Sequence, residues 1–90
     1  MKFIVENKVF DTEKAEVICE FKERKPLIWN KSFSTWEYAT LYRTNKGNWF
    51  SVIERLKECT QLNNTQVEEL LKGLDEVELY EKYFEKLEEV

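Results

Sequence analysis

Residues 40–50 read Thr-Leu-Tyr-Arg-Thr-Asn-Lys-Gly-Asn-Trp-Phe, and this stretch decides the fold. Two runs of β-favouring residues meet here at a polar turn, which holds the only glycine among the first 72 residues. Glycine adopts a positive φ without steric cost, so the pattern predicts a β-hairpin that turns at Gly47. We therefore expect a chain built partly from antiparallel strands.

Further strands are expected on both sides of this turn. Trp36, Tyr38, Thr40 and Tyr42 alternate along residues 35–43 and share one strand face. The strand after the turn is predicted to run roughly from 49 to 56, although a helical spacing of its apolar residues leaves a change to helix open. Pro26 interrupts the strand pattern, which favours a loop folded onto the body. Upstream we expect a strand at 2–6, after which the chain turns and re-enters the apolar layer at 9–10, and a second strand at 16–22. The expected loop is 23–34.

The C-terminal third is expected to form two helices. Thr65 and Glu68 have the spacing of a capping box, which predicts that a helix begins there. A second apolar stripe at helical spacing starts at Val77. The predicted fold class is α+β: a single domain over residues 1–90, with a four-stranded antiparallel sheet of two hairpins and two C-terminal helices packed on one face.

The composition is that of a small globular domain. Apolar residues make up 42% of the chain and aromatic residues 14%, which is enough for one core. No apolar run approaches the ~18 residues of a membrane helix and no signal peptide is evident, so we expect a cytoplasmic protein without a membrane partner. In that compartment Cys19 and Cys59 are expected to be reduced and at least half-buried rather than bridged.

The formal net charge of −4 is unevenly distributed. Residues 1–64 hold 11 Lys and Arg against 9 Asp and Glu, whereas residues 65–90 hold 3 against 9. One interpretation is a solvated helix face that keeps a small domain in solution; the other is a surface that attracts a basic partner. The residues expected to bind such a partner are Glu68, Glu69, Asp75, Glu76, Glu78, Glu81 and Glu85, together with Trp29 and Lys31 in the irregular segment.

The residue types that support catalysis are scarce. The chain has no histidine, which removes the usual proton carrier at neutral pH and the base of most Ser and Cys nucleophile systems. Gly47 and Gly73 stand alone, so there is no glycine-rich phosphate loop. Two cysteines without histidine do not supply a four-ligand zinc site. We expect no enzyme activity, no cofactor and no metal.

An aromatic cluster interleaved with basic residues has two interpretations. Aromatic rings beside cations on one sheet face are typical of proteins that stack single-stranded nucleic acid. The favoured interpretation is instead that these rings form the sheet face packed against the helices. The aromatic residues are Trp29, Trp36, Tyr38, Tyr42 and Trp49; the basic ones are Lys31, Arg43 and Lys46, with a modest patch at Lys22, Arg24, Lys25 and Lys31.

Two motifs and an acidic tail carry a resemblance. They are Phe-Asp-Thr-Glu-Lys-Ala-Glu-Val-Ile at 10–18, Leu-Tyr-Arg-Thr-Asn-Lys-Gly-Asn-Trp-Phe at 41–50, and the segment 80–89. With these the chain resembles a family of short proteins from phages and other mobile elements of Firmicutes, some of which look like anti-CRISPR inhibitors. The match is loosest over 23–34 and 52–63.

The resemblance implies a non-enzymatic inhibitor of a bacterial defence system. Such a protein would use its acidic surface to bind a Cas effector or a similar nuclease and block its access to nucleic acid. The resemblance transfers no catalytic or binding residue, because the motif residues have structural reasons to be present. The alternatives are a nucleic-acid-binding accessory or regulatory protein of a mobile element, and a module that forms homodimers.

Overall fold

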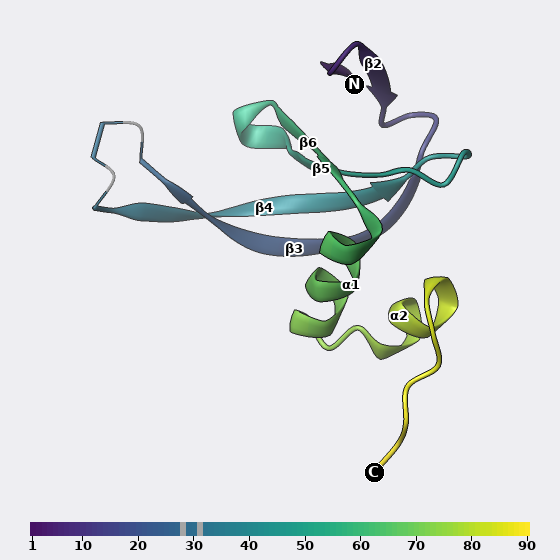
Figure 1. Cartoon of the computed structure of the whole chain (residues 1–90). Helices are drawn as coiled ribbons and strands as arrows, with labels where there is room; N and C mark the ends of the chain where they lie inside the picture. Colours follow the sequence, from purple (N-terminus) through teal and green to yellow (C-terminus); the bar gives the residue numbers. More distant parts are fainter. Residues whose placement is uncertain (28, 31) are drawn as a thin grey trace.

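A four-stranded antiparallel sheet lies at the centre of the molecule (Figure 1). This arrangement comes from a computed structural model, which describes residues 1–27, 29–30 and 32–90. The strands follow one another in the order β3-β4-β5-β6, and a separate two-stranded sheet is formed by β1 and β2. The strands are β1 (Lys2–Val5), β2 (Lys8–Asp11), β3 (Glu16–Pro26), β4 (Ser34–Arg43), β5 (Trp49–Ile53) and β6 (Glu58–Leu62).

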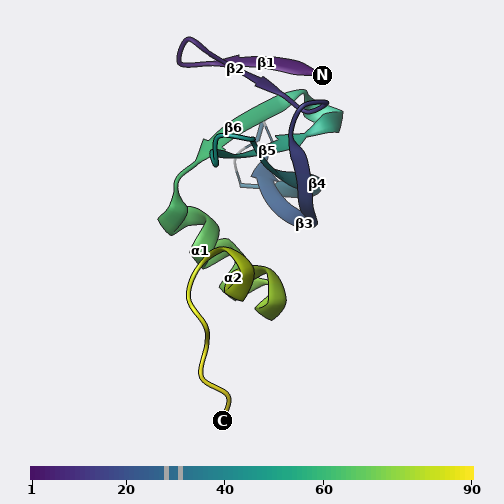
Figure 2. The same ribbon diagram turned by 90° about the vertical axis from the view of Figure 1, so that its right-hand side faces the viewer.

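The molecule has three layers, which Figure 2 shows from the side. The β1–β2 hairpin lies on one side of the central sheet, and α1 (Asn64–Gly73) and α2 (Val77–Tyr83) lie on the other. Phe50 belongs to the hairpin-side core and Trp49 to the helix-side core. Neither helix of the described chain is long and apolar enough to cross a membrane.

The α+β class and the four-stranded antiparallel sheet are confirmed, but the expected strand membership is wrong. The N-terminal strands pair only with each other, because Glu6 and Asn7 adopt positive φ angles of 50° and 64° and close a tight turn. The expected strand 49–56 ends at Ile53 and continues as a 3₁₀ turn, η1 (Glu54–Leu56). Lys57 then takes a φ of 53°, and the chain returns as β6, which the sequence did not predict.

The expectation that the Trp36–Tyr42 face packs against the helices is also wrong. The helices cover the opposite face, where Leu41 is completely buried. The reason lies at the end of β6, where the chain enters α1 directly: Trp49 Nε1 donates a 3.0 Å hydrogen bond to Oδ1 of Asn64, the first residue of α1. This bond ties the helix to the face that carries Trp49 and Leu41.

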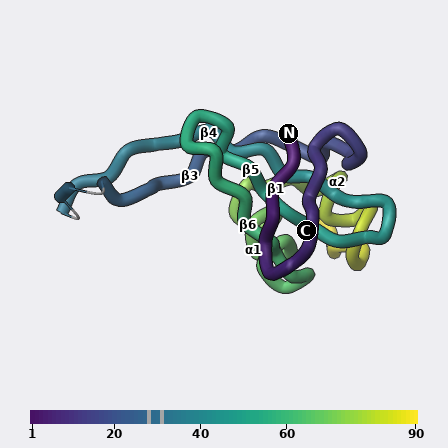
Figure 3. Tube along the Cα trace, turned by 90° about the horizontal axis from the view of Figure 1, so that it is seen from above, coloured from purple at the N-terminus to yellow at the C-terminus, as the bar shows by residue number. Residues whose placement is uncertain are grey.

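The segment 23–34, expected to be a loop on the body, begins and ends in strands instead; residues 28 and 31 of it lie outside the described residues. β3 continues to Pro26 and pairs with β4 over its whole length, with Pro26 opposite Ser34. Proline is tolerated at this point because it is the last residue of an edge strand. The result is a two-stranded ribbon that projects beyond β5 and β6 (Figures 1 and 3). We call residues 22–38 the arm.

The capping box of α1 exists but lies two residues earlier than predicted. The Asn63 side chain accepts a hydrogen bond from the Gln66 backbone N–H, and the Gln66 side chain accepts one from the Asn63 backbone N–H, both at 2.8 Å. The chemistry is that of the Thr65–Glu68 pattern, with amides in place of hydroxyl and carboxylate. Because β6 ends at Leu62, the helix begins directly after it, and Asn63 rather than Thr65 takes the capping position.

The two cysteines lie in different cores, which confirms that they are half-buried and unbridged. Cys19 packs on the helix side of the sheet and Cys59 on the hairpin side. Burial raises the pKa of both thiols, and the negative charge of Glu76 raises the pKa of Cys19 further. Both are therefore poor nucleophiles at neutral pH.

We predict that the two glycines respond oppositely to substitution by alanine. Gly47 has a φ of +87°, and a Cβ there would lie 3.2 Å from Nη2 of Arg43, so Gly47→Ala should lower the free energy of unfolding by about 1–2 kcal/mol. Gly73 ends α1 with open space around it, so Gly73→Ala should raise the free energy of unfolding by about 0.4–1 kcal/mol. Urea denaturation of both variants measures this, and an unchanged midpoint for Gly47→Ala would contradict the turn geometry.

We also predict an alkaline shift in the reactivity of the thiols. Because the folded chain holds both thiol protons more tightly, alkylation by iodoacetamide should rise at a higher pH in the folded than in the urea-unfolded chain. By the same linkage the free energy of unfolding should fall as the pH rises above the ordinary thiol pKa. Mass spectrometry of alkylated chains gives the profile, and coincident folded and unfolded profiles would refute the burial argument.

Candidate functional site

The expected acidic residues of the helices face outward. α1 buries Val67 and Leu71, and α2 buries Tyr80, so the carboxylates are left on the outer sides. Neither ion pair of the described residues, Lys25–Glu58 and Arg55–Glu37, includes a helical acid. Glu69, Asp75, Glu78 and Glu85 are exposed, and Glu68, Glu76 and Glu81 are half-buried. The structure thus gathers these seven residues at the helical end without neutralising them.

A hollow of about 430 Å³ lies where α1 passes into α2. Asp75, with a φ of 56°, turns the chain at this point, and the Glu76 N–H donates back to the Leu71 carbonyl at 3.0 Å. Apolar and acidic side chains line the hollow together: Asp75, Glu76, Val77, Glu78 and Leu79, with Lys82 at its edge. Such a hollow suits the aliphatic stem and charged head of a lysine or arginine.

Trp29 lies in the arm, between the end of β3 and the start of β4, and the arm projects away from the acidic helices (Figure 1). Its side chain is 80% exposed. Lys31, the other residue expected to join the acidic set, lies outside the described residues. The expected binding residues therefore do not form one site: Trp29 belongs to the arm and the seven acids to the helical end.

The expected aromatic cluster divides into a buried part and an exposed part. Tyr42 stacks on Phe50 at 5.0 Å, and Trp49 meets Tyr83 edge to face at 5.1 Å. Arg43 lies over both Trp49 and Tyr83, at 5.3 and 5.1 Å from the ring centroids, and so joins the sheet to α2. Tyr42, Trp49 and Arg43 are therefore structural.

Trp36 and Tyr38 form the exposed part, on the face of the arm that neither the helices nor the hairpin covers. Their side chains are 62% and 69% exposed. Each ring has a cation opposite it on β3, with Arg24 at 5.3 Å from the Trp36 ring and Lys22 at 5.4 Å from the Tyr38 ring. Uncovered tryptophan and tyrosine side chains beside cations are uncommon on a monomer and mark a binding surface.

A buried carboxylate fixes the base of the arm. Glu37 is 5% exposed and points to the helix side of β4. Arg55 of η1 holds it through Nε at 2.6 and 3.0 Å and through Nη2, and this contact raises the pKa of Arg55. Sequence reasoning missed this pair, because Glu37 in an alternating strand has the same pattern as a solvent-facing acid.

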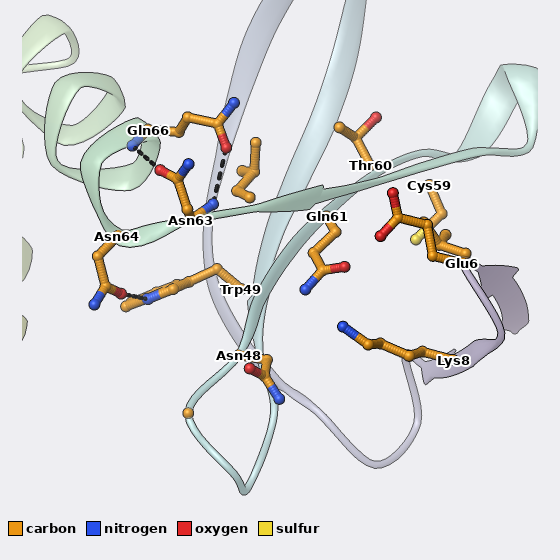
Figure 4. A pocket seen from close by; sticks show the side chains of 13 residues that line it. Glu6, Lys8, Asn48, Trp49, Cys59, Thr60, Gln61, Asn63, Asn64 and Gln66 are labelled. Carbon is orange, nitrogen blue, oxygen red and sulfur yellow. Dashed lines mark hydrogen bonds between the residues drawn. The ribbon is translucent and has the colours of Figure 1, made fainter.

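A cleft of about 730 Å³ lies along the outer edge of β6 and is lined mainly by polar side chains (Figure 4). Two of its amides already serve the fold: Asn63 caps α1 and Asn64 binds Trp49. Lys8 and Gln61 point into the remaining space. Cys59, with its raised pKa, is the thiol of this lining. The cleft offers hydrogen bonds to a polar ligand, but no nucleophile paired with a base.

In the described part of the chain, no group of three or more Cys, Asp or Glu side chains is arranged to hold a metal ion. Comparison with protein-family models, curated proteins and solved structures finds no match to this chain.

Proposed function

We propose that this protein is a non-enzymatic inhibitor that binds a basic protein surface through its helical end. The observation that carries the proposal is the acid-lined hollow at the junction of α1 and α2, with unneutralised carboxylates around it. A partner lysine or arginine in the hollow would place its stem on Val77 and Leu79 and its charge among Asp75, Glu76 and Glu78. The target in this proposal is a nuclease of a bacterial defence system, of which a Cas effector is the most specific candidate.

The charge distribution also favours rapid association with such a target. Nine acids against three basic residues in 65–90 create a negative field at one end of the molecule. That field acts over about 8–10 Å at physiological salt and steers a basic partner toward the helices. Basic surfaces of nucleases are where nucleic acid binds, so occupying one blocks the substrate without any chemistry by this chain. The resemblance to mobile-element proteins supports this cytoplasmic role.

We predict that neutralising three acids of the helical end weakens inhibition. The variant Glu69→Gln/Glu78→Gln/Glu85→Gln removes three exposed charges and should weaken inhibition of Cas-effector DNA cleavage by about tenfold or more, because both steering and ion pairing are lost. The measurement is the protein concentration that halves cleavage, at two salt concentrations. Inhibition by the unaltered protein should weaken as salt rises.

The matched control removes the same amount of negative charge at positions outside the helical end. Glu13→Gln/Glu20→Gln/Glu54→Gln removes three exposed carboxylates outside the helices and should leave inhibition unchanged. An equal loss in both variants would show that only net charge matters. If no basic partner co-purifies and effector cleavage is unaffected by the unaltered protein, the proposed function is wrong.

A further inference from the structure

We propose that the uncovered face of the arm is a second binding site, which takes single-stranded nucleic acid. Four groups make this site: the rings of Trp36 and Tyr38 and the cations of Arg24 and Lys22. They lie on the face of the sheet that the helices do not cover, and they do not depend on the inhibitor proposal.

The site has the two components that single-stranded nucleic acid requires. Bases need flat apolar surfaces, and rings that are 62% and 69% exposed leave most of their area open even with a cation beside each. Phosphates need cations, and Arg24 and Lys22 each lie directly across the strand pair from a ring. One base and one phosphate can therefore be held at each ring–cation pair.

The two cations of this face lie at the two rings, although the whole chain is acidic. Along β3, Lys22 and Arg24 share the face of the two rings, whereas Glu23 pairs with Glu37 on the opposite face. Glu20 and Glu54 are the exposed acids beside this face, and both line the hollow next to the rings, where Arg55 is paired with Glu37. On that opposite face Glu23 shares a hollow with Glu69 of α1, so the acids next to the helices and the two cations lie on different faces of the ribbon.

The spacing of the rings selects a single strand over a duplex. Trp36 and Tyr38 are two residues apart on one strand, which places them about 6.8 Å apart along β4. Successive bases of one duplex strand rise by about 3.4 Å, so they cannot lie on the two rings in turn. An extended, unstacked single strand can place one base on each ring. A hollow of about 260 Å³ beside both rings gives room for a base that is turned out of the chain; its charged lining is Glu20, Glu54 and the Glu37–Arg55 pair.

An apolar surface of a partner protein is the other ligand to consider for this face, but two features favour nucleic acid. Each exposed ring is matched by its own cation rather than by aliphatic neighbours. The repeat of ring and cation also runs along the strand, as a polynucleotide's bases and phosphates do. Trp29 at 80% and Phe33 at 62% exposure extend the aromatic surface toward the tip.

The test measures fluorescence anisotropy of a fluorescein-labelled oligothymidylate at low salt. The unaltered protein should bind it and bind a duplex of equal length at least about fivefold more weakly. With two phosphates engaged, the logarithm of the association constant should fall against the logarithm of salt with a slope of about −1.4. Trp36→Ala should weaken binding by about fivefold or more, and Trp36→Phe should restore most of it, because phenylalanine still stacks.

Matched variants separate this site from general effects. Lys22→Gln/Arg24→Gln should abolish the salt dependence, whereas Lys8→Gln/Lys14→Gln, with the same charge change on the hairpin side, should not. Ile4→Ala/Val9→Ala removes equally exposed apolar groups and should have no effect. No anisotropy change with the unaltered protein, equal affinity for the duplex, or equal loss in the control variants would overturn the site. Effector inhibition by the Trp36→Ala variant should be intact, so the two proposals fail independently.

Discussion

The structure depends on β5 being buried on both faces. All five of its residues are buried, and the adjacent pair Trp49 and Phe50 points into opposite cores. Each of these two side chains contributes about 2–3 kcal/mol when it is removed from water, which is large beside the ~5–15 kcal/mol that separates folded from unfolded domains. Two layers must therefore cover the sheet at β5, and the hairpin and the helices each supply one. Neither layer extends over the arm, which is why its face remains open.

This constraint explains what the sequence could and could not predict. The hairpin at Gly47, the strand up to Arg43 and the two helices follow from local turn, alternation and capping patterns, which depend on neighbouring residues. The choice of the sheet face that receives the helices does not follow from such local patterns. Trp36 and Tyr38 look like core residues, whereas the face of Leu41 also carries the charged Glu37 and Arg43, so the pattern alone favours the wrong face. A contact distant in sequence, between Trp49 and Asn64, fixes the choice.

The candidate surfaces were predictable to different degrees. The acidic helical surface could be foreseen because like charges at helical spacing remain on the outside whenever an apolar stripe is buried. The hollow among Asp75, Glu76 and Val77 could not, since it arises from the positive φ of Asp75 at the helix junction. The arm was hidden by Pro26, whose usual meaning is the end of a strand. Here the strand also ends at the proline, but it stays paired with β4 over residues 23–25, which belong to the expected loop.

The bidentate grip of Arg55 on Glu37 has a mechanical consequence. It anchors β4 at the point where the ribbon leaves the sheet, so that the arm is braced against η1 instead of swinging about its base. A braced ribbon keeps its outer face at a set distance and orientation from the helical end. If both proposed surfaces are occupied at once, the two ligands are therefore held at a fixed separation.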